Sequence, residues 1–304
     1  MSEIVLVTGA AGGNQGATGR HVAELLLDRG VPVRAFVRAS DARAEVLRAR
    51  GADVVTGDLR DIATVEPALA GVDRVFFTYP VTDGLLEATA AVAAAARSAG
   101  VRQLVEVSQL TPQPHSHSPR TRQHWLSEQV FDWAGVGAVH LRATVFYENI
   151  RALAASGLPT GELAVPLGDP HNTIPLVAAA DVARVAATLL TDRTTDADPF
   201  YRLVGEVPTV GDIVAAFATT LGTPIRYVNL DEQTWRERAL ARGTNPHAVE
   251  HLSRLWQVFR DSATRNEAIF DVTDTVERVT GAPPETLQQF LHTNRGALLT
   301  GRPS

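Results

Sequence analysis

In the first half of the chain, short apolar runs rich in β-branched residues alternate with runs rich in Ala and Leu. This alternation is typical of parallel strands whose two faces are both covered by helices. The expected strands are Ile4–Val7, Val33–Val37, Asp53–Val55, Arg74–Thr78, Gln103–Val107 and Val139–Ala143. The expected helices between them are Arg20–Arg29, Ala42–Arg50, Ile62–Leu69, Leu85–Ala99 and Trp125–Trp133. The pattern predicts an α/β fold with a doubly wound parallel sheet.

The regular alternation weakens after Asn149, where helical patterns become more frequent. Residues 174–190 still predict a helix, and residues 200–206 predict a strand that returns to the same sheet. We therefore expect a sheet domain and a smaller, helix-rich domain that binds substrate. The sheet domain takes residues 1–149 and 173–206, and the smaller domain takes residues 150–172 and 207–304.

Two helices are expected at Asp231–Arg242 and Pro246–Phe259. The residues between them begin with Gly243, a helix stop, and Pro246 suits the first position of the second helix. In that helix Val249, Leu252, Trp256 and Phe259 recur every three or four residues and form one apolar stripe. The pattern fits either a helical-hairpin lid over a pocket, spanning residues 231–260, or an ordinary hairpin on the domain surface.

Composition narrows the function classes. With 304 residues, of which 45% are hydrophobic, the chain can bury a large core. Its formal charge of -6 argues against nucleic acid as a partner, because such binding needs clustered basic residues. The sequence has no run of roughly 18 apolar residues and no signal-peptide core, so we expect a soluble, cytoplasmic protein without a membrane partner. Its oligomeric state is not predicted.

A glycine-rich stretch, TGAAGGNQGATGRH at residues 8–21, lies between the first strand and the first helix. Glycines in this context let the backbone approach a pyrophosphate at a helix N-terminus, as in Rossmann-type domains. The predicted cofactor-binding residues here are Gly9, Gly12, Asn14, Gln15, Gly16 and Gly19. If Gly19 is the third glycine of the motif, four extra residues lie between the second and the third glycine. Asn14 and Gln15 would then pack over the pyrophosphate. A surface turn without ligand is the alternative.

The end of the second strand distinguishes NADP from NAD, because an arginine there accepts the 2′-phosphate. Arg38 holds this position without an acidic residue before it in the strand, which predicts NADPH. Arg34 is a weaker candidate for the same role, and Ser40 is expected to add a hydrogen bond. Asp58, followed by Leu59, is expected beside the adenine, although it could instead cap the next helix.

Taken together, these motifs resemble the NmrA-like branch of the atypical short-chain dehydrogenase/reductases. The residues that carry the resemblance are TGAAG and GRHVAELLLDRG near the N-terminus, VRAFVR, GDL at 57–59, HWLSEQVFDWAGV at 124–136, HLRATVFYEN at 140–149 and Asp-Val-Ala at 181–183. The resemblance implies that NADP(H) lies across the sheet of the first half, with Tyr79 near it. It also implies that the substrate lies between that sheet and the C-terminal part.

The wider superfamily uses a Ser and a Tyr-x-x-x-Lys pair, in which the Tyr protonates the carbonyl oxygen. This chain cannot form that pair, because all 28 of its basic residues are arginines. Ser108 matches the serine region, and His124 is a candidate proton donor, since its ordinary pKa is near 6.5. The alternatives are that His124 is paired structurally with Glu128, or that a phenol on the substrate supplies the proton.

Substrate contacts are expected where strands end near the nicotinamide and on the hairpin. The predicted substrate-binding residues are Gln109, Phe146, Tyr147, Asn149, Trp235 and Trp256. No metal site is expected, although His247-Ala-Val-Glu-His251 matches a zinc-peptidase pattern and His115 and His117 lie near His124 in sequence.

The predicted function is an NADPH-dependent ketoreductase. Some triad-less reductases of aromatic polyketide tailoring resemble this pattern, which favours a ketone or quinone of a polycyclic aromatic small molecule as substrate. Two alternatives remain. One is a non-catalytic NADP(H) redox sensor that acts through a protein partner, and the other is a quinone oxidoreductase.

Overall fold

The computed structural model describes residues 3–13, 17–154, 157–192, 198–262 and 268–300. Seven of the described strands form one parallel sheet in the order β10-β6-β5-β4-β1-β2-β3. Their bounds are Ile4–Thr8 (β1), Val33–Val37 (β2), Asp53–Thr56 (β3), Val72–Phe77 (β4), Gln103–Gln109 (β5), Ala138–Ala143 (β6) and Phe200–Leu203 (β10). The strand order reverses between β1 and β4, so the predicted doubly wound topology is confirmed.

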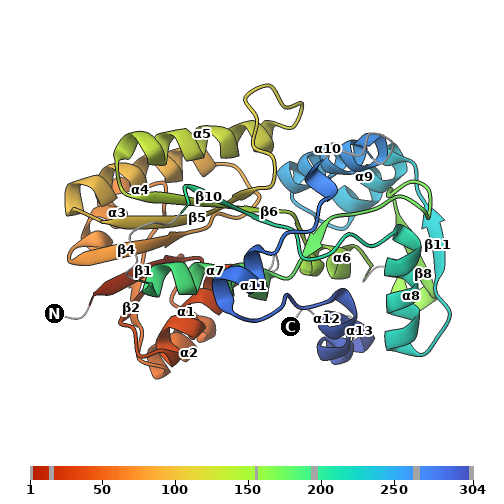
Figure 1. The fold of residues 1–304 in the computed structure, drawn as a ribbon, viewed down its shortest axis with the longest axis horizontal. Helices are drawn as coiled ribbons and strands as arrows, with labels where there is room; N and C mark the ends of the chain where they lie inside the picture. Colours follow the sequence, from red (N-terminus) through yellow and green to blue (C-terminus); the bar gives the residue numbers. More distant parts are fainter. Residues whose placement is uncertain (1–2, 14–16, 155–156, 193–197, 263–267, 301–304) are drawn as a thin grey trace.

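Helices cover both faces of this sheet (Figure 1). Val5 and Val7 point to one face and Leu6 to the other, as the alternation of side chains along a strand requires. The first face packs against α1 (Thr18–Asp28), α2 (Ala42–Ala49) and α7 (Ala179–Thr191). The second packs against α3 (Ile62–Leu69), α4 (Leu85–Ala99) and α5 (Pro119–Ala134). Because both faces of the central strands are buried, β1 is apolar except for Thr8 and β2 is apolar except for Arg34.

Helix α5 starts at Pro119 rather than at the predicted Trp125. The Ser118 side chain accepts a hydrogen bond from the Thr121 backbone N–H, and Pro119 occupies the first helical position. The early start places Arg120 and His124 one turn apart on the same helix. A second difference lies in residues 174–190, where β9 (Leu176–Val177) precedes α7, so the predicted helix began too early.

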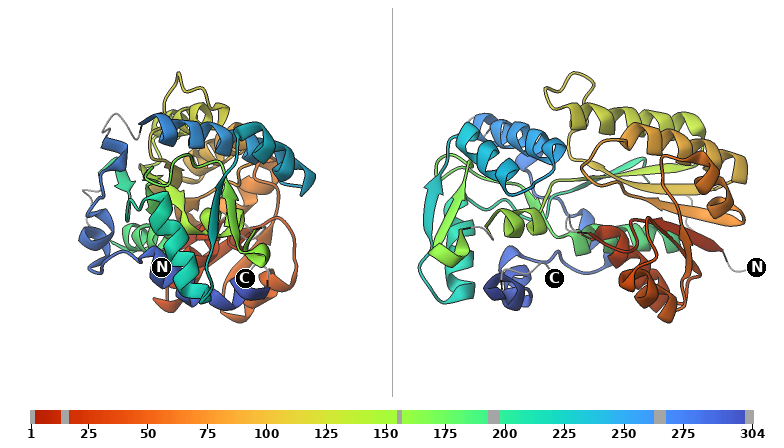
Figure 2. Two further views of the ribbon diagram at one scale, coloured as in Figure 1. Left: turned by 90° about the vertical axis from the view of Figure 1, so that its right-hand side faces the viewer. Right: turned by 180° about the vertical axis from the view of Figure 1, so that it is seen from behind.

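The remaining elements lie beyond the carboxyl ends of the sheet strands, apart from α11, which packs beside α7 (Figures 1 and 2). They are β7 (Val145–Phe146), α6 (Tyr147–Ala154), η1 (Leu158–Thr160), β8 (Glu162–Val165), α8 (Val210–Leu221), β11 (Arg226–Asn229), α9 (Glu232–Ala241), α10 (Pro246–Ser262), η2 (Ala268–Phe270), α11 (Thr275–Thr280), α12 (Leu287–Thr293) and α13 (Arg295–Thr300). Most of them share an apolar core of their own, whereas Val276 of α11 packs with α7 in the core under the sheet. No helix in the described ranges combines the length and apolar character that a membrane crossing requires.

The predicted hairpin is present as α9 and α10, and its apolar stripe faces inward. Val249, Trp256 and Phe259 are buried, and Leu252 is partly buried. Trp235 of α9 packs with Val249 of α10 and fixes the two helices against each other.

A buried carboxyl group joins α6, which lies in the part of the molecule beyond the strand ends (the second part), to α7, which covers the sheet. Glu148, in the first turn of α6, accepts a hydrogen bond of 3.4 Å from the backbone N–H of Ala179, the first residue of α7. Burial raises its pKa to about 7 from an ordinary value of 4.5, and the nearby Arg151 only partly opposes this. Glu148 therefore titrates close to neutral pH in the folded protein.

We predict that Glu148→Gln stabilises the protein above pH 7. The unfolded carboxyl ionises near pH 4.5 and the folded one near pH 7, so between these values unfolding releases a proton and the free energy of unfolding falls as the pH rises. Gln keeps the acceptor for Ala179 without a charge. Denaturant unfolding at pH 8 should show the variant more stable by about 2 to 3 kcal/mol, with a much smaller difference at pH 5. An equal difference at both pH values would contradict a raised pKa.

Candidate active site

The loop after β1 is a tight turn shaped by glycines. Gly9 and Gly12 adopt positive φ values of 64° and 72°, and the Gly12 N–H donates to the Gly9 carbonyl oxygen at 3.0 Å. A Cβ on Gly19 would overlap the Thr8 carbonyl oxygen and the Gly9 backbone, so only glycine lets α1 approach β1 this closely. The N–H groups at the start of α1, which have no side-chain cap among the described residues, thus lie beside the carboxyl end of β1, an arrangement suited to a phosphate.

Three of the predicted loop residues, Asn14, Gln15 and Gly16, lie outside the described residues. Their packing over a pyrophosphate stays a prediction.

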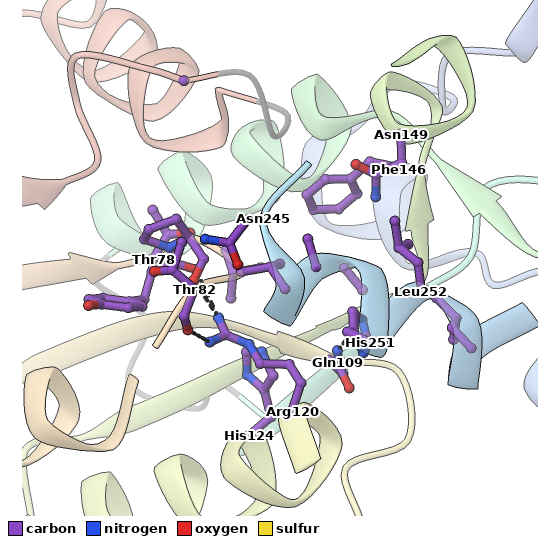
Figure 3. Close-up of a pocket in the computed structure, with 18 of the residues that line it drawn as sticks. Thr78, Thr82, Gln109, Arg120, His124, Phe146, Asn149, Asn245, His251 and Leu252 are labelled. Atoms are coloured by element: carbon purple, nitrogen blue, oxygen red, sulfur yellow. Dashed lines mark hydrogen bonds between the residues drawn. The ribbon is translucent and has the colours of Figure 1, made fainter. Parts of the chain in front are cut away.

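A cavity of about 1560 Å³ extends from this turn across the strand ends to α6, α9 and α10. It brings together most of the predicted site residues, from elements far apart in the sequence. Those that line it are Gly9, Gly12, Gly19, Arg38, Asp58, Leu59, Tyr79, Ser108, Gln109, His124, Phe146, Asn149 and Trp235. Figure 3 shows Arg120 and His124 at one side of the cavity and Phe146 and Asn149 at another.

Charges around the cavity are mostly positive, although the whole chain is acidic. The arginines among its described lining residues are Arg38, Arg43, Arg60, Arg120, Arg242 and Arg254, and the lining carboxylate is Asp58. Asp58 binds the Arg60 guanidinium at 2.8 Å, and this contact lowers the Asp58 pKa to about 2. The cavity is therefore suited to an anionic ligand.

At the end of β2, Arg38 is exposed to the cavity and forms no hydrogen bond or ion pair with the described residues. The weaker candidate Arg34 is excluded, because its guanidinium is held by Asp53 at 2.7 Å and by two carbonyl oxygens near the end of α3. Ser40 Oγ accepts a hydrogen bond from Arg48, and Ser40 is not among the residues that line the cavity. A contact of Ser40 with the cofactor stays a prediction.

Asp58 does not cap the following helix, since Asp61 is the N-cap of α3 and accepts from the Ala63 N–H. The structure thus leaves Asp58, beside Leu59, as a cavity residue at the end of β3. Tyr79, after β4, donates its hydroxyl proton to the Asp83 carbonyl oxygen at 3.0 Å and also lines the cavity.

Three buried polar atoms on residues that line the cavity lack a hydrogen-bond partner among the described residues. They are Ser108 Oγ, Arg120 Nε and His124 Nδ1. Ser108 lies at the end of β5, whereas Arg120 and His124 lie on α5. Buried polar atoms are nearly always paired, so three such atoms around one cavity are a sign of a missing ligand.

The expectation that His124 is a proton donor suited to neutral pH is wrong. Burial lowers its pKa well below 6.5, and the charge of Arg120 lowers it further. The ring is therefore neutral near pH 7. His124 is not paired with Glu128 either, because Glu128 forms an ion pair of 2.7 Å with Arg142.

Two predicted substrate contacts are corrected by the packing. Tyr147 is fully buried, and its hydroxyl donates to the Glu285 carbonyl oxygen at 3.0 Å. Trp256 is fully buried in the same apolar core of the second part. Neither residue lines the cavity, because the inward faces of α6 and α10 are used for packing.

A buried histidine connects the hairpin to the sheet. The Gln109 amide oxygen accepts from Thr121 Oγ1, so Gln109 Nε2 donates to His251 Nε2 at 2.9 Å. His251 Nδ1 then faces Ser118 Oγ at 3.2 Å. Burial, with a contribution from Arg120, lowers the His251 pKa to about 3, so the ring stays neutral.

Residues of the His247–His251 motif form contacts within the protein. Glu250 forms ion pairs with Arg236 and Arg254. In the described part of the chain, no three His, Asp or Glu side chains come close enough to hold a metal ion.

The sequence analysis missed Arg120 and the structural role of His251. The signal for Arg120 was present in Ser118-Pro119, a helix start that would have set Arg120 one turn before His124. The His251 contacts join residues more than 130 positions apart, which no local pattern reveals.

We predict that Gly19→Ala strongly destabilises the protein even without a ligand, because the added methyl group forces α1 away from β1. Gly13→Ala is a matched control from the same loop, since its Cβ would meet open space and its φ is not positive. Thermal unfolding without cofactor should show a Tm lower by about 5 °C or more for Gly19→Ala and almost no change for Gly13→Ala. Equal effects of the two substitutions would refute the close approach.

The chain is similar along nearly its whole length to several characterised reductases. It is 29% identical over 288 residues to an NAD(P)H azoreductase of Xenophilus azovorans, which covers 94% of this chain and 97% of the relative. It is 32% identical over 290 residues to the (4-alkanoyl-5-oxo-2,5-dihydrofuran-3-yl)methyl phosphate reductase of Streptomyces griseus, covering 94% and 96%.

Its fold matches the crystal structure of an NADPH-dependent quinone oxidoreductase of Escherichia coli in complex with NADPH. The TM-score is 0.80 at 25% identity, with 95% of this chain and 99% of the other covered. Because the pattern that defines the NmrA-like family matches residues 1–291, nearly the entire sequence, the protein belongs to the NmrA-like family.

Proposed function

We propose that the protein is an NADPH-dependent reductase that transfers hydride to a ketone or quinone carbonyl of a polycyclic aromatic substrate. The observation that carries this proposal is the continuity of the cavity. It joins the glycine turn and Arg38 to the buried, unpartnered atoms of Ser108, Arg120 and His124. The names of the relatives, an azoreductase, a quinone oxidoreductase and a dihydrofuranone phosphate reductase, support reduction as the reaction class.

The residues present fit NADPH. The close approach of α1 to β1 at Gly19 would let the N–H groups of α1 bind a pyrophosphate. Arg38, which forms no ion pair with the described residues, would bind the 2′-phosphate. Asp58 and Leu59 would border the adenine, and Tyr79 the ribose beside it. Bound there, NADPH supplies the hydride.

The substrate would occupy the part of the cavity between the sheet and the second part of the molecule. Phe146, Asn149, Leu252 and Trp235 line this region. These residues would form a mainly apolar wall for a flat ring system, with the Asn149 amide and Gln109 as polar contacts. We therefore assign residues 150–172 and 207–304 mainly to substrate binding, and residues 1–149 and 173–206 to cofactor binding.

The hairpin of α9 and α10 would act as the cover of the site. Its connecting loop contributes Thr244 and Asn245 to the cavity lining, and His251 bonds it to the end of β5. In this arrangement the hairpin excludes water from the reacting carbon, which favours hydride transfer over side reactions.

Ser108 is assigned to the substrate oxygen, because its buried hydroxyl has no partner among the described residues and can donate a hydrogen bond. His124 would act as a neutral hydrogen-bond partner and not as an imidazolium acid. The proton that completes the reduction then comes from solvent or from a hydroxyl group on the substrate itself. A quinone with a neighbouring phenol meets this requirement.

Turnover tests the proposal against a binding-only redox sensor. We expect steady oxidation of NADPH, followed by absorbance, when the protein is mixed with polycyclic quinones or hydroxyanthraquinones. The rate should fall about 100-fold or more when Ser108 is replaced by Ala, since one donor to the substrate oxygen is lost. Tight NADPH binding without turnover across a broad carbonyl and quinone panel would favour the sensor.

Cofactor choice gives a separate prediction. Arg38→Ala should weaken NADPH binding by about 10-fold or more and leave NADH binding nearly unchanged, because only NADPH carries the 2′-phosphate. Arg34→Ala is the matched control. It should leave the preference for NADPH intact, because that guanidinium is bonded to Asp53 and the end of α3. Dissociation constants from fluorescence titration check both variants, and an unchanged preference in Arg38→Ala would overturn the assignment.

A further inference from the structure

Arg120 is a buried cation without an acidic partner. Only 5% of the residue is exposed, and no described carboxylate lies within ion-pair distance of its guanidinium. Burial lowers its pKa to about 10, so it remains charged at neutral pH. Because a buried charge without a counterion costs several kcal/mol, such residues are usually paired.

Backbone carbonyl groups satisfy only part of its hydrogen-bonding capacity. One Nη atom donates to the Thr82 carbonyl oxygen at 3.2 Å, and the other to those of Tyr79 and Pro80 at 3.1 and 2.9 Å. These bonds hold the loop after β4 and are drawn in part in Figure 3. Nε stays buried and unpartnered, and the positive charge stays unbalanced.

The groups around Arg120 leave the charge uncompensated. His124 and His251 are both neutral, because burial and the nearby guanidinium lower their pKa values. Burial raises the pKa of the Tyr79 phenol, so that group is neutral as well. Among the described residues, Arg120 is therefore a fixed positive charge in the cavity wall with no carboxylate within ion-pair distance.

We propose that Arg120 stabilises the negative charge that reduction places on the substrate oxygen, and so takes over the electrostatic part of the missing Tyr-Lys pair. This inference rests on the proposed function. As hydride reaches the carbonyl carbon, the π electron pair of the C=O bond moves to oxygen, and the nicotinamide is oxidised. The oxygen becomes an alkoxide, which a proton from solvent or from a substrate hydroxyl later neutralises. A guanidinium is not a proton donor near neutral pH, so Arg120 contributes its field alone.

The consequence can be measured without cofactor. An apolar cavity raises the pKa of a bound phenol, whereas a nearby unpaired cation lowers it. A monohydroxyanthraquinone changes colour when its phenol ionises, so its pKa in the ligand-free protein can be read by absorbance. In the wild-type protein we expect a pKa at least about one unit below that of the free dye, a tenfold preference for the phenolate.

Three substitutions distinguish an effect of the Arg120 charge from an effect of its hydrogen bonds to the loop after β4. Arg120→Gln keeps hydrogen-bond donors for the loop without the charge, so the pKa of the bound dye should rise above the free value. Arg120→Lys restores the charge and should keep the pKa low. Arg122→Gln is the matched control on the same helix, because Arg122 bonds to the Ser116 carbonyl oxygen and does not line the cavity. Arg122→Gln should leave the pKa of the bound dye at its wild-type value.

Kinetics provide the second readout. With NADPH and a quinone, Arg120→Gln should lower kcat about 100-fold with little change in the KM for NADPH. Failure of the dye to bind the wild-type protein, or a bound pKa equal to or above the free value, would overturn the inference even if Arg120→Gln fails to fold. If the wild-type protein oxidises NADPH with a quinone but does not lower the pKa of the bound dye, only this inference is overturned. A shifted dye without any turnover would support the anion site and overturn the proposed function.

Discussion

A chain without lysine has only arginine as a permanent side-chain cation, and a guanidinium does not release its proton near neutral pH. This constraint governs the chemistry that the site can perform. Positive charge can be placed wherever an arginine reaches, but the proton transfer that a lysine-assisted tyrosine performs elsewhere is not available. The cavity follows this rule, because Arg38 at the end of β2 and the buried Arg120 of α5 both line it.

The two parts of the molecule are joined by apolar packing, such as that of Val276 against α7, and by buried polar groups. His251 bonds the hairpin to Gln109 and Ser118, and Glu148 bonds α6 to the start of α7. Burial lowers the pKa of His251 to about 3, so this ring is neutral above that pH. Burial raises the pKa of Glu148 to about 7, so this carboxyl group is neutral below that pH. The geometry of the cavity therefore depends on contacts that are sensitive to charge.

Much of the fold could be predicted from the sequence, because strands buried on both faces are apolar runs with few alternatives. Val33–Val37, Ile62–Leu69 and Leu85–Ala99 coincide with observed elements. The start of α5 was missed because the helical pattern was sought in apolar residues, whereas Ser118 and Pro119 begin the helix. In the site, the strand-end residues Arg38 and Ser108 followed from topology. The burial of Tyr147 and Trp256 and the environment of His124 depend on contacts between distant segments, which local patterns do not encode.

The central claim is that this cavity holds NADPH and a carbonyl or quinone substrate at once, with the reacting carbons in contact. Transfer of deuterium from NADPH labelled at C4 of the nicotinamide tests this most directly. We predict that mass spectrometry of the product from a polycyclic ketone will find one deuterium on the former carbonyl carbon, delivered from one face of the nicotinamide. Product without the label, or label lost to water, would contradict direct transfer within the cavity.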